Sequence, residues 1–137
     1  KYQMTDLAAC LGISSLKDIK KLINIRRSIL KTYVENIHNP YVKVLHKNND
    51  IDYLVCPWLC TLVVKKDRYG LMEKLRKNGI ESAQVHYRND RYSVFGGRKE
   101  DLKIMDKIEE NYLVIPIHHK VTIQKAEKIC ELINQGW

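Results

Sequence analysis

The run WLCTLVV, residues 58–64, is an apolar stretch from which the fold can be built outward. Apolar side chains stand at both odd and even positions, which is typical of a strand buried on both faces. Three residues later, Asp67 is a good helix N-cap, and Asn78-Gly79 is a good C-terminal stop. The apolar residues of the helix between them are Leu71, Met72 and Leu75. This part of the chain therefore predicts a buried strand followed by a short helix.

Two helices are predicted upstream of this strand. The first begins at Thr5-Asp6, and Gly12 followed by Ser14-Ser15 indicates a break. The second runs from about Ser15 to Ile37, because its apolar residues recur at helical spacing. Asn39-Pro40 ends it, since a residue before proline disfavours the helical conformation.

Five shorter segments complete the middle of the chain. Residues 41–45 are β-rich and predict a short strand, and residues 46–52 predict a polar turn. Residues 80–87 predict another strand. The polar, glycine-containing residues 88–98 predict a loop, and loops are where binding residues concentrate. Residues 99–110 predict a helix.

The C-terminal part predicts one more strand and one more helix. Residues 112–117 are extended, and Pro116 makes them an edge strand or an unpaired segment. Thr122 caps a last helix whose apolar face consists of Ala126, Ile129, Cys130 and Ile133. The order of elements predicts an α+β fold, in which a small antiparallel or mixed sheet carries helices on one face. We find no domain boundary within residues 1–137.

Composition and charge argue against several classes of protein. The 137 residues are 45% hydrophobic and 29% charged, which is ordinary for a globular domain and argues against disorder. No apolar run approaches the ~20 residues of a transmembrane helix. The formal net charge is +8, but the cations are spread along the chain, apart from one basic helix around Lys17 to Lys31. We therefore favour a solvated basic surface over a nucleic-acid site.

The cysteines favour reduced thiols. Cys56 and Cys60 form C-x3-C, not the C-x2-C of zinc knuckles, and no His/Cys set with ligand spacing lies nearby. Cys10 and Cys130 lie in helical patterns and are interpreted as small core residues. We expect no metal site, and reduced thiols indicate a cytoplasmic protein.

Two polar clusters, His86 to Asp90 and His118 to Lys120, directly follow apolar extended stretches. Strands deliver such side chains to a surface or a cleft, where His can accept a proton near neutral pH and Arg can grip a phosphate. The alternative interpretation is a pair of solvated strand ends. The sequence contains no phosphate-binding loop, G-x-S-x-G or H-E-x-x-H motif.

Taken in order, several segments resemble the C-terminal portion of the DegT/DnrJ/StrS family of fold-type-I sugar aminotransferases, which depend on pyridoxal phosphate (PLP). Residues 1–16 follow the family pattern G-Y-N-Y-R-[ML]-[ST]-x-L-x-A-A-L-G-x-x-x-L at most positions. Trp58 heads its strand as in the family, and Gly79-Ile80-Glu81 and His86-Tyr87 match two further motifs. Residues 115–122, IPIHHKVT, resemble "l-P-l-h-p-x-l-T". The resemblance covers essentially the whole chain.

The resemblance implies that residues 1–137 are the C-terminal small domain of an aminotransferase, with its preceding long helix. In the family, the lysine that holds PLP and the aspartate that pairs with the pyridine nitrogen lie upstream, in a large domain. The chain starts at Lys1 rather than Met, and we expect a longer protein to supply that domain. The resemblance therefore assigns no catalytic residue to this chain, which alone is expected to be inactive.

The resemblance also implies substrates and assembly. The family transfers an amino group, usually from glutamate, to a keto group on a nucleotide-linked sugar, in the synthesis of surface polysaccharides or glycans. Its members are homodimers with active sites at the subunit interface. The implied partners are thus a nucleotide-linked keto sugar, an amino-acid donor and a second subunit, with no nucleic acid and no membrane.

The matched positions also imply site residues. Lys1 and Gln3 stand where the family approaches the neighbouring subunit's PLP phosphate, and they replace the usual Asn and Arg. The Gln3 amide can still donate to a phosphate oxygen, and Lys1 can supply charge. The stretch from Arg88 to Asp90 replaces the more usual prolines, which implies a distinct sugar or nucleotide pocket. The residues assigned to substrate binding are His86, Tyr87, Arg88, Asn89 and His118.

Two other functions are left open. The chain could belong to a non-catalytic regulatory relative, which the presence or absence of the upstream lysine would decide. It could also be a stand-alone basic module that binds nucleic acid, for which steeply salt-dependent binding would be the evidence. Because residues 58–64 are expected to pack partly on a missing domain, we also expect exposed apolar surface and self-association.

Overall fold

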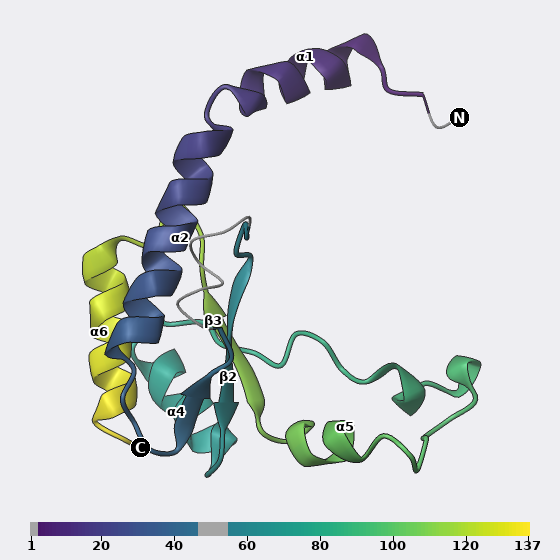
Figure 1. Cartoon of the computed structure of the whole chain (residues 1–137), viewed down its shortest axis with the longest axis vertical. Coiled ribbons are helices and arrows are strands. Elements are labelled where there is room, and N and C mark those ends of the chain that lie inside the picture. The colour runs from purple at the N-terminus through teal and green to yellow at the C-terminus, as the bar shows by residue number, and fades with distance from the viewer. Residues whose placement is uncertain (1–2, 47–54) are drawn as a thin grey trace.

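The computed structural model describes residues 3–46 and 55–137, whose course is shown in Figure 1. Its centre is a three-stranded antiparallel sheet in the order β1-β2-β3. The strands are β1 (Val42–Val44), β2 (Leu59–Val64) and β3 (Tyr112–Pro116). The helices are α1 (Asp6–Leu16), α2 (Ile19–Asn36), α4 (Arg68–Lys77), α5 (Lys103–Ile108) and α6 (Ile123–Asn134). The predicted α+β class is confirmed.

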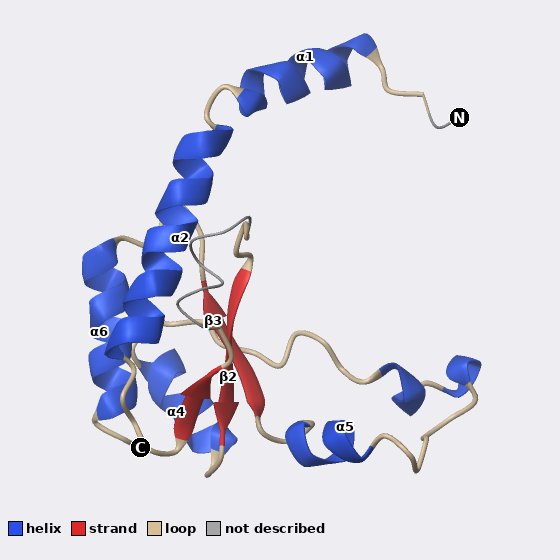
Figure 2. Ribbon diagram, in the orientation of Figure 1, coloured by secondary structure: helices blue, strands red, loops and turns tan. Residues whose placement is uncertain are grey.

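Helices α2, α4 and α6 cover one face of the sheet (Figure 2). The residues of α6 that are buried are the four predicted from its spacing: Ala126, Ile129, Cys130 and Ile133. They share one core with Leu30 of α2, Leu62 of β2 and Leu75 of α4. Both predicted N-caps are confirmed, because the side chains of Asp67 and Thr122 accept hydrogen bonds from the first turns of α4 and α6.

The other face of β2 is less buried than predicted. Cys60, Leu62 and Val64 are buried, whereas the alternate residues are only partly covered. Trp58, directly before the strand, is 62% exposed. The prediction of a strand buried on both faces is therefore wrong for the described residues, because the helices cover only one face. The exposed apolar surface expected here is confirmed.

Residues 80–87 do not form the predicted strand. Only Ala83 pairs with the sheet, through two backbone hydrogen bonds with Val114 on the outer side of β3. Pro116, two residues along β3 on the same side, has no N–H to donate. In the other direction, the Tyr112 carbonyl already accepts a hydrogen bond from Arg68 Nη1 at 3.3 Å. The ladder therefore stops after one pair, and β3 is an edge strand, as predicted from Pro116.

The first helix stands apart from the core. Thr5 caps α1 as predicted, but the helix continues through Gly12 and Ser14, and the break falls at Lys17-Asp18. A single glycine costs a helix only about 1 kcal/mol, which is too little to end it here. None of the residues of α1 is buried, so Cys10 is exposed rather than in the core as predicted. Figure 1 shows α1 projecting away from the sheet.

No helix within residues 3–46 and 55–137 is both long and apolar enough to span a membrane.

Candidate functional site

Two projections leave the body of the molecule on the same side and give it a C-shaped outline (Figure 1). One is α1. The other is the segment between Ala83 and β3, residues 84–111, which we call the arm. It contains two short 3-10 turns and α5. The predicted substrate residues 86–89 lie in the first part of this arm.

A buried ion-pair cluster holds the arm in shape. The guanidinium of Arg88 donates through Nε and Nη2 to the two carboxylate oxygens of Asp90, and through Nη1 to Asp106. Arg88 is 4% exposed and Asp90 is 6% exposed. Glu109 Oε2 lies 3.5 Å from Arg88 Nη1 and 3.1 Å from Arg98 Nη1. The cluster therefore joins the start of the arm to α5.

The cluster also explains why α5 is shorter than the predicted helix at residues 99–110. The Lys99 backbone N–H donates to Asp90 Oδ2 at 2.8 Å, and the Lys99 carbonyl accepts from Arg88 Nη2 at 3.3 Å. These contacts hold residue 99 outside helical geometry, and α5 begins only at Lys103. The Arg88 hydrogen bond and that of the Lys99 amide hold the pKa of Asp90 well below its usual range.

A second buried arginine fixes the base of the arm. Arg68 of α4 is 4% exposed, and its Nη1 donates to Gln84 Oε1 at 3.0 Å and to the Glu109 carbonyl at 3.2 Å. Gln84 Nε2 donates to the same Glu109 carbonyl at 2.9 Å. Arg68 therefore ties the two ends of the arm together. The sequence carries no sign of this role, because a single Arg in the first turn of a short helix does not indicate such partners.

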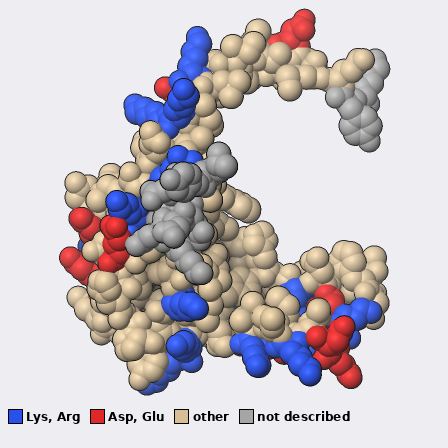
Figure 3. Space-filling model, in the orientation of Figure 1, with Lys and Arg blue, Asp and Glu red and all other residues tan. Residues whose placement is uncertain are grey.

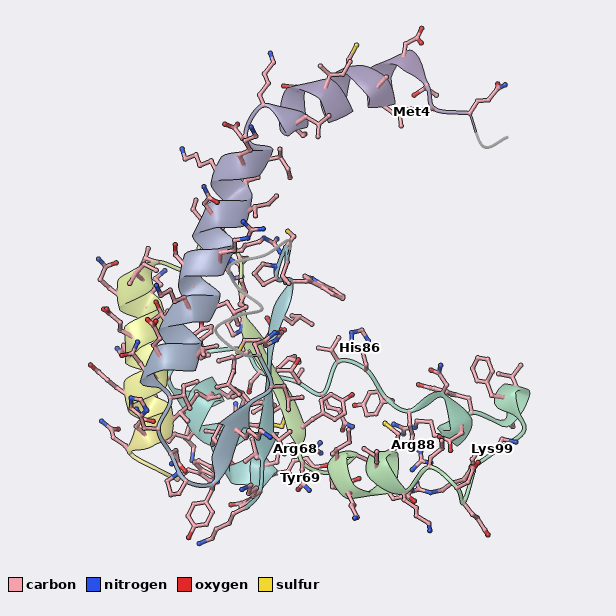
Figure 4. All side chains as sticks on the ribbon, in the orientation of Figure 1. Met4, Arg68, Tyr69, His86, Arg88 and Lys99 are labelled. Carbon is pink, nitrogen blue, oxygen red and sulfur yellow. The ribbon has the colours of Figure 1, made fainter. Side chains whose placement is uncertain are left out.

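The predicted residues His86, Tyr87 and Asn89 lie on the surface of the arm. The His86 ring lies 5.8 Å from the Trp58 ring, centroid to centroid, at 59°. Figure 4 shows His86 on the side of the arm that faces the open space of the C. The Arg91 guanidinium stacks on Tyr87, 4.3 Å from the ring centroid. The substrate-binding roles of these residues stay predictions.

Arg88 differs from its three neighbours. Its guanidinium faces inward and is surrounded by carboxylates, which raises its pKa further above the ordinary value. Its hydrogen-bonding groups are therefore occupied by the arm itself. The prediction that Arg88 contacts substrate rested on its position after an extended stretch and in the family's substrate loop, and nothing in the sequence indicates that Asp106 lies beside it.

His118 lies just beyond the end of β3. It is exposed, and its Nδ1 accepts a hydrogen bond from the Lys120 backbone N–H at 3.2 Å. His118 and Trp58 both line one groove of about 720 Å³. Trp58 is thus near the ring of His86 in the arm and lines the same groove as His118. In the sequence, the feature that could have pointed to Trp58 as a site residue is its position directly before β2.

Of the two predicted cofactor residues, Gln3 lies just ahead of α1. Gln3 is exposed, in an extended segment ahead of the Thr5 cap, and Lys1 lies outside the described residues. Figure 1 places this end of the chain across the open side of the C from the arm. In Figure 3, the side chains along the inner side of α1 are mostly uncharged. Within the part of the chain that the structure describes, no group of three His, Cys, Asp or Glu residues could hold a metal ion.

The α+β fold and the motifs in the sequence point to one class of protein, the sugar aminotransferases. The model of the DegT/DnrJ/EryC1/StrS aminotransferase family matches residues 1–134, and the chain belongs to that family. The chain is 23% identical over 136 residues to GDP-perosamine synthase from Escherichia coli O157:H7, covering 98% of this chain and 36% of the relative. It thus spans about a third of the length of that curated relative.

Solved sugar aminotransferases share the fold. The crystal structure of the sugar aminotransferase CalS13 from Micromonospora echinospora matches with a TM-score of 0.87 and 23% identity, over 98% of this chain and 36% of that chain. The PLP form of the putative sugar aminotransferase Spr1654 from Streptococcus pneumoniae matches with a TM-score of 0.78 and 20% identity, over 97% and 36%. The predicted small-domain fold is therefore confirmed.

Proposed function

We propose that the chain is the small-domain part of a PLP-dependent aminotransferase that transfers an amino group from glutamate to the keto group of a nucleotide-linked sugar. The observation that carries the proposal is the family match over residues 1–134. A relative named GDP-perosamine synthase supports a nucleotide-linked sugar as the substrate class. The PLP form of a solved structure with the same fold supports the cofactor.

The proposal divides the work between this chain and the rest of the protein. Because the chain spans 36% of the curated relative's length, we assign the PLP-bearing lysine to a large domain outside residues 1–137. We further propose a homodimer, in which the N-terminal segment of one subunit reaches the active site of the other. The exposed apolar face of α1 supports a role in packing against these additional parts.

Among the described residues, one side chain is suited to contact PLP, at the phosphate group of the cofactor. The Gln3 side chain is exposed and its amide can donate a hydrogen bond to a phosphate oxygen. Lys1 is proposed to add positive charge there. When bound, PLP supplies the electron sink for amine transfer. Residues 3–46 and 55–137 are assigned no other contact to it.

On the substrate side, we propose that His86, Tyr87, Asn89 and His118 bind the sugar nucleotide. Their side chains are exposed and offer donors and acceptors for hydroxyl and phosphate oxygens. Arg88 is proposed to act as a positioning residue, because its guanidinium holds the arm that carries His86. In this proposal Arg88 does not contact the substrate itself, and instead it holds His86 and the rest of the arm in place.

The test uses the protein at its full encoded length. Visible absorbance is recorded with PLP before and after borohydride reduction, and amine transfer from glutamate is then assayed on a panel of nucleotide-linked keto sugars. We expect PLP to become fixed to one lysine outside residues 1–137, and an amino sugar to form. A folded, dimeric protein that fixes no PLP would contradict the proposal and would favour the non-catalytic relative.

A pair of variants tests the site within this chain. We expect His86→Ala to lower kcat/KM by about tenfold, which is the effect of losing one hydrogen bond worth about 1.4 kcal/mol. His38→Ala is the matched control, because His38 is also exposed and lies at the end of α2, outside the proposed site. Equal activity of the two variants would remove His86 from the site.

A further inference from the structure

The groove beside Trp58 is large enough for a small molecule. Its volume of about 720 Å³ lies within the ~300–1,000 Å³ that is usual for such sites. The last residues of β3 and the residues just after it, 114–118, line one part of it, and residues 78–83 line another. The first half of α6, Arg26 of α2 and Trp58-Leu59 at the start of β2 also line it. The groove is therefore built from parts of the chain that lie far apart in the sequence.

The charged residues of this groove are mostly cations. Those that line it are Arg26, Lys120, Lys125 and Lys128, with Glu81 as the single carboxylate among its described lining residues. None of the four cations takes part in an ion pair among residues 3–46 and 55–137. Lys125 and Lys128 lie at i and i+3, on one side of α6. Unpaired cations around a concave surface produce a positive potential that attracts anions.

The groove also offers aromatic and apolar surface. Trp58 lines it and is 62% exposed. Arg26 Nη1 donates to the Pro57 carbonyl at 3.1 Å, which holds this arginine next to the Trp58 position. Val85, which is 39% exposed, and the half-buried Ile80 supply apolar lining. An indole face and a guanidinium are the groups on which flat rings stack.

Two other grooves in the described part of the chain differ from this one in charge. The groove at the base of the arm has exposed aromatic side chains, Tyr69 and Tyr87, but its charges nearly cancel, because Glu109 and Glu110 line it together with Arg68, Arg91 and Arg98. Glu110 forms an ion pair with Arg68, and Glu109 forms one with Arg98. The groove between α2 and the start of α6 has Lys21 as its single lysine or arginine. The groove at Trp58 differs from both, because four cations and one carboxylate line it together with an exposed indole.

We propose that this groove binds the nucleoside diphosphate part of the substrate, with the phosphates at Lys125 and Lys128 and the base against Trp58. The inference rests on the proposed function for the identity of the substrate, and it adds residues that the family resemblance did not assign. His118 lines the same groove and is placed to contact the ribose or the phosphates. The sugar then extends past Trp58 toward His86, whose ring lies 5.8 Å away.

The experiment is calorimetric titration of the full-length protein with GDP and with UDP, in the absence of PLP and glutamate. We expect one of the two nucleotides to bind. The matching nucleoside, which lacks the phosphates, and inorganic pyrophosphate, which lacks the base, should each bind at least about tenfold more weakly. The double substitution Lys125→Ala/Lys128→Ala is expected to weaken nucleotide binding at least about tenfold. Trp58→Leu is expected to weaken the nucleotide but not pyrophosphate.

The matched control is Lys17→Ala/Lys20→Ala. It removes the same charge from two exposed lysines that are also three residues apart and lie outside the groove. Nucleotide affinity that is equal in the two double variants would overturn the proposal. So would pyrophosphate binding as tightly as the nucleotide. Because titration needs no PLP, failure here is distinguishable from failure of the proposed function, which is measured by PLP fixation.

Discussion

At the scale of single residues, two buried arginines determine the shape of the arm. Arg68 joins its two ends through Gln84 and the Glu109 carbonyl, and Arg88 joins its first turn to α5. A buried guanidinium is costly unless its N–H groups are paired. All three nitrogens of the Arg88 guanidinium have partners, as do Nη1 and Nη2 of Arg68, whereas Arg68 Nε has none among the described residues. The arm has little apolar core of its own, so these ion pairs define its conformation.

We expect Arg88→Gln to loosen the arm while leaving the sheet intact. The substitution removes the two hydrogen bonds from Arg88 to Asp90. It also leaves the carboxylates that surround Arg88 close together without the positive charge between them. Amide hydrogen exchange should accelerate at least about tenfold within residues 88–106 and stay unchanged in β2 and α6. Arg91→Gln is the control, because Arg91 is exposed and stacks on Tyr87. Similar exchange in both variants would contradict the role given to Arg88.

The arm should also respond to acid. Hydrogen bonds from Arg88 hold the pKa values of Asp90 and Asp106 below their usual range. Carboxylates with lowered folded pKa values add stability above the unfolded pKa of about 3.9, and this contribution is lost as the pH falls toward the folded values. We expect exchange protection of the arm, corrected for intrinsic rates, to be constant from pH 7 to about pH 5 and to decline below about pH 4. The Arg88→Gln variant should show a smaller decline.

The four cysteines should separate into two classes. Cys10 and Cys56 are exposed, whereas Cys60 and Cys130 are buried. Burial raises the pKa of the Cys130 thiol to about 12 and that of Cys60 further, so that neither forms thiolate near neutral pH. With a thiol reagent at pH 8, we expect two rapid reactions in the 137-residue chain and four in denaturant. Rapid reaction of all four in the native chain would show that the core is open.

At the scale of elements, caps and apolar periodicity predicted a helix or strand correctly wherever contacts with the rest of the chain did not prevent it. α6 has a capping Thr122 and apolar residues at i, i+3, i+4 and i+7, and it forms as predicted. Residues 80–87 were equally apolar, but Pro116 and Arg68 remove their hydrogen-bond partners on β3, and no strand forms. The partners of a strand are remote in sequence, so periodicity alone does not reveal their absence.

The two N-terminal helices should therefore differ in their sensitivity to mutation. Leu30 of α2 is 1% exposed, whereas Leu11 of α1 is 62% exposed. We expect Leu30→Ala to lower the free energy of unfolding of the 137-residue chain by about 2–5 kcal/mol, and Leu11→Ala to change it by about 0.5 kcal/mol or less. Denaturant titration monitored by circular dichroism measures both. A large effect of Leu11→Ala would mean that α1 is covered in solution.

At the scale of the whole molecule, the candidate site was predicted in part. The sequence pointed to His86 and His118, and the structure places Trp58 near the His86 ring and in the same groove as His118. It did not predict that Arg88 faces inward or that Lys125 and Lys128 share a groove with His118. These relations depend on how α5 and α6 dock, and they have no local signature in the sequence. Lys1 lies outside the described residues.

The exposed apolar side of α1 leads to a prediction about assembly. Leu7 and Leu11 are 73% and 62% exposed and lie at i and i+4, on one face of the helix. Apolar surface of this kind is favourable to bury, at about 25 cal/mol per Å². We expect the 137-residue chain to self-associate with increasing concentration in sedimentation velocity, and Leu7→Lys/Leu11→Lys to shift it to monomer. The control Lys17→Ala/Lys20→Ala should associate like the unmodified chain. A chain that is monomeric at every concentration would show that α1 folds back and covers these residues.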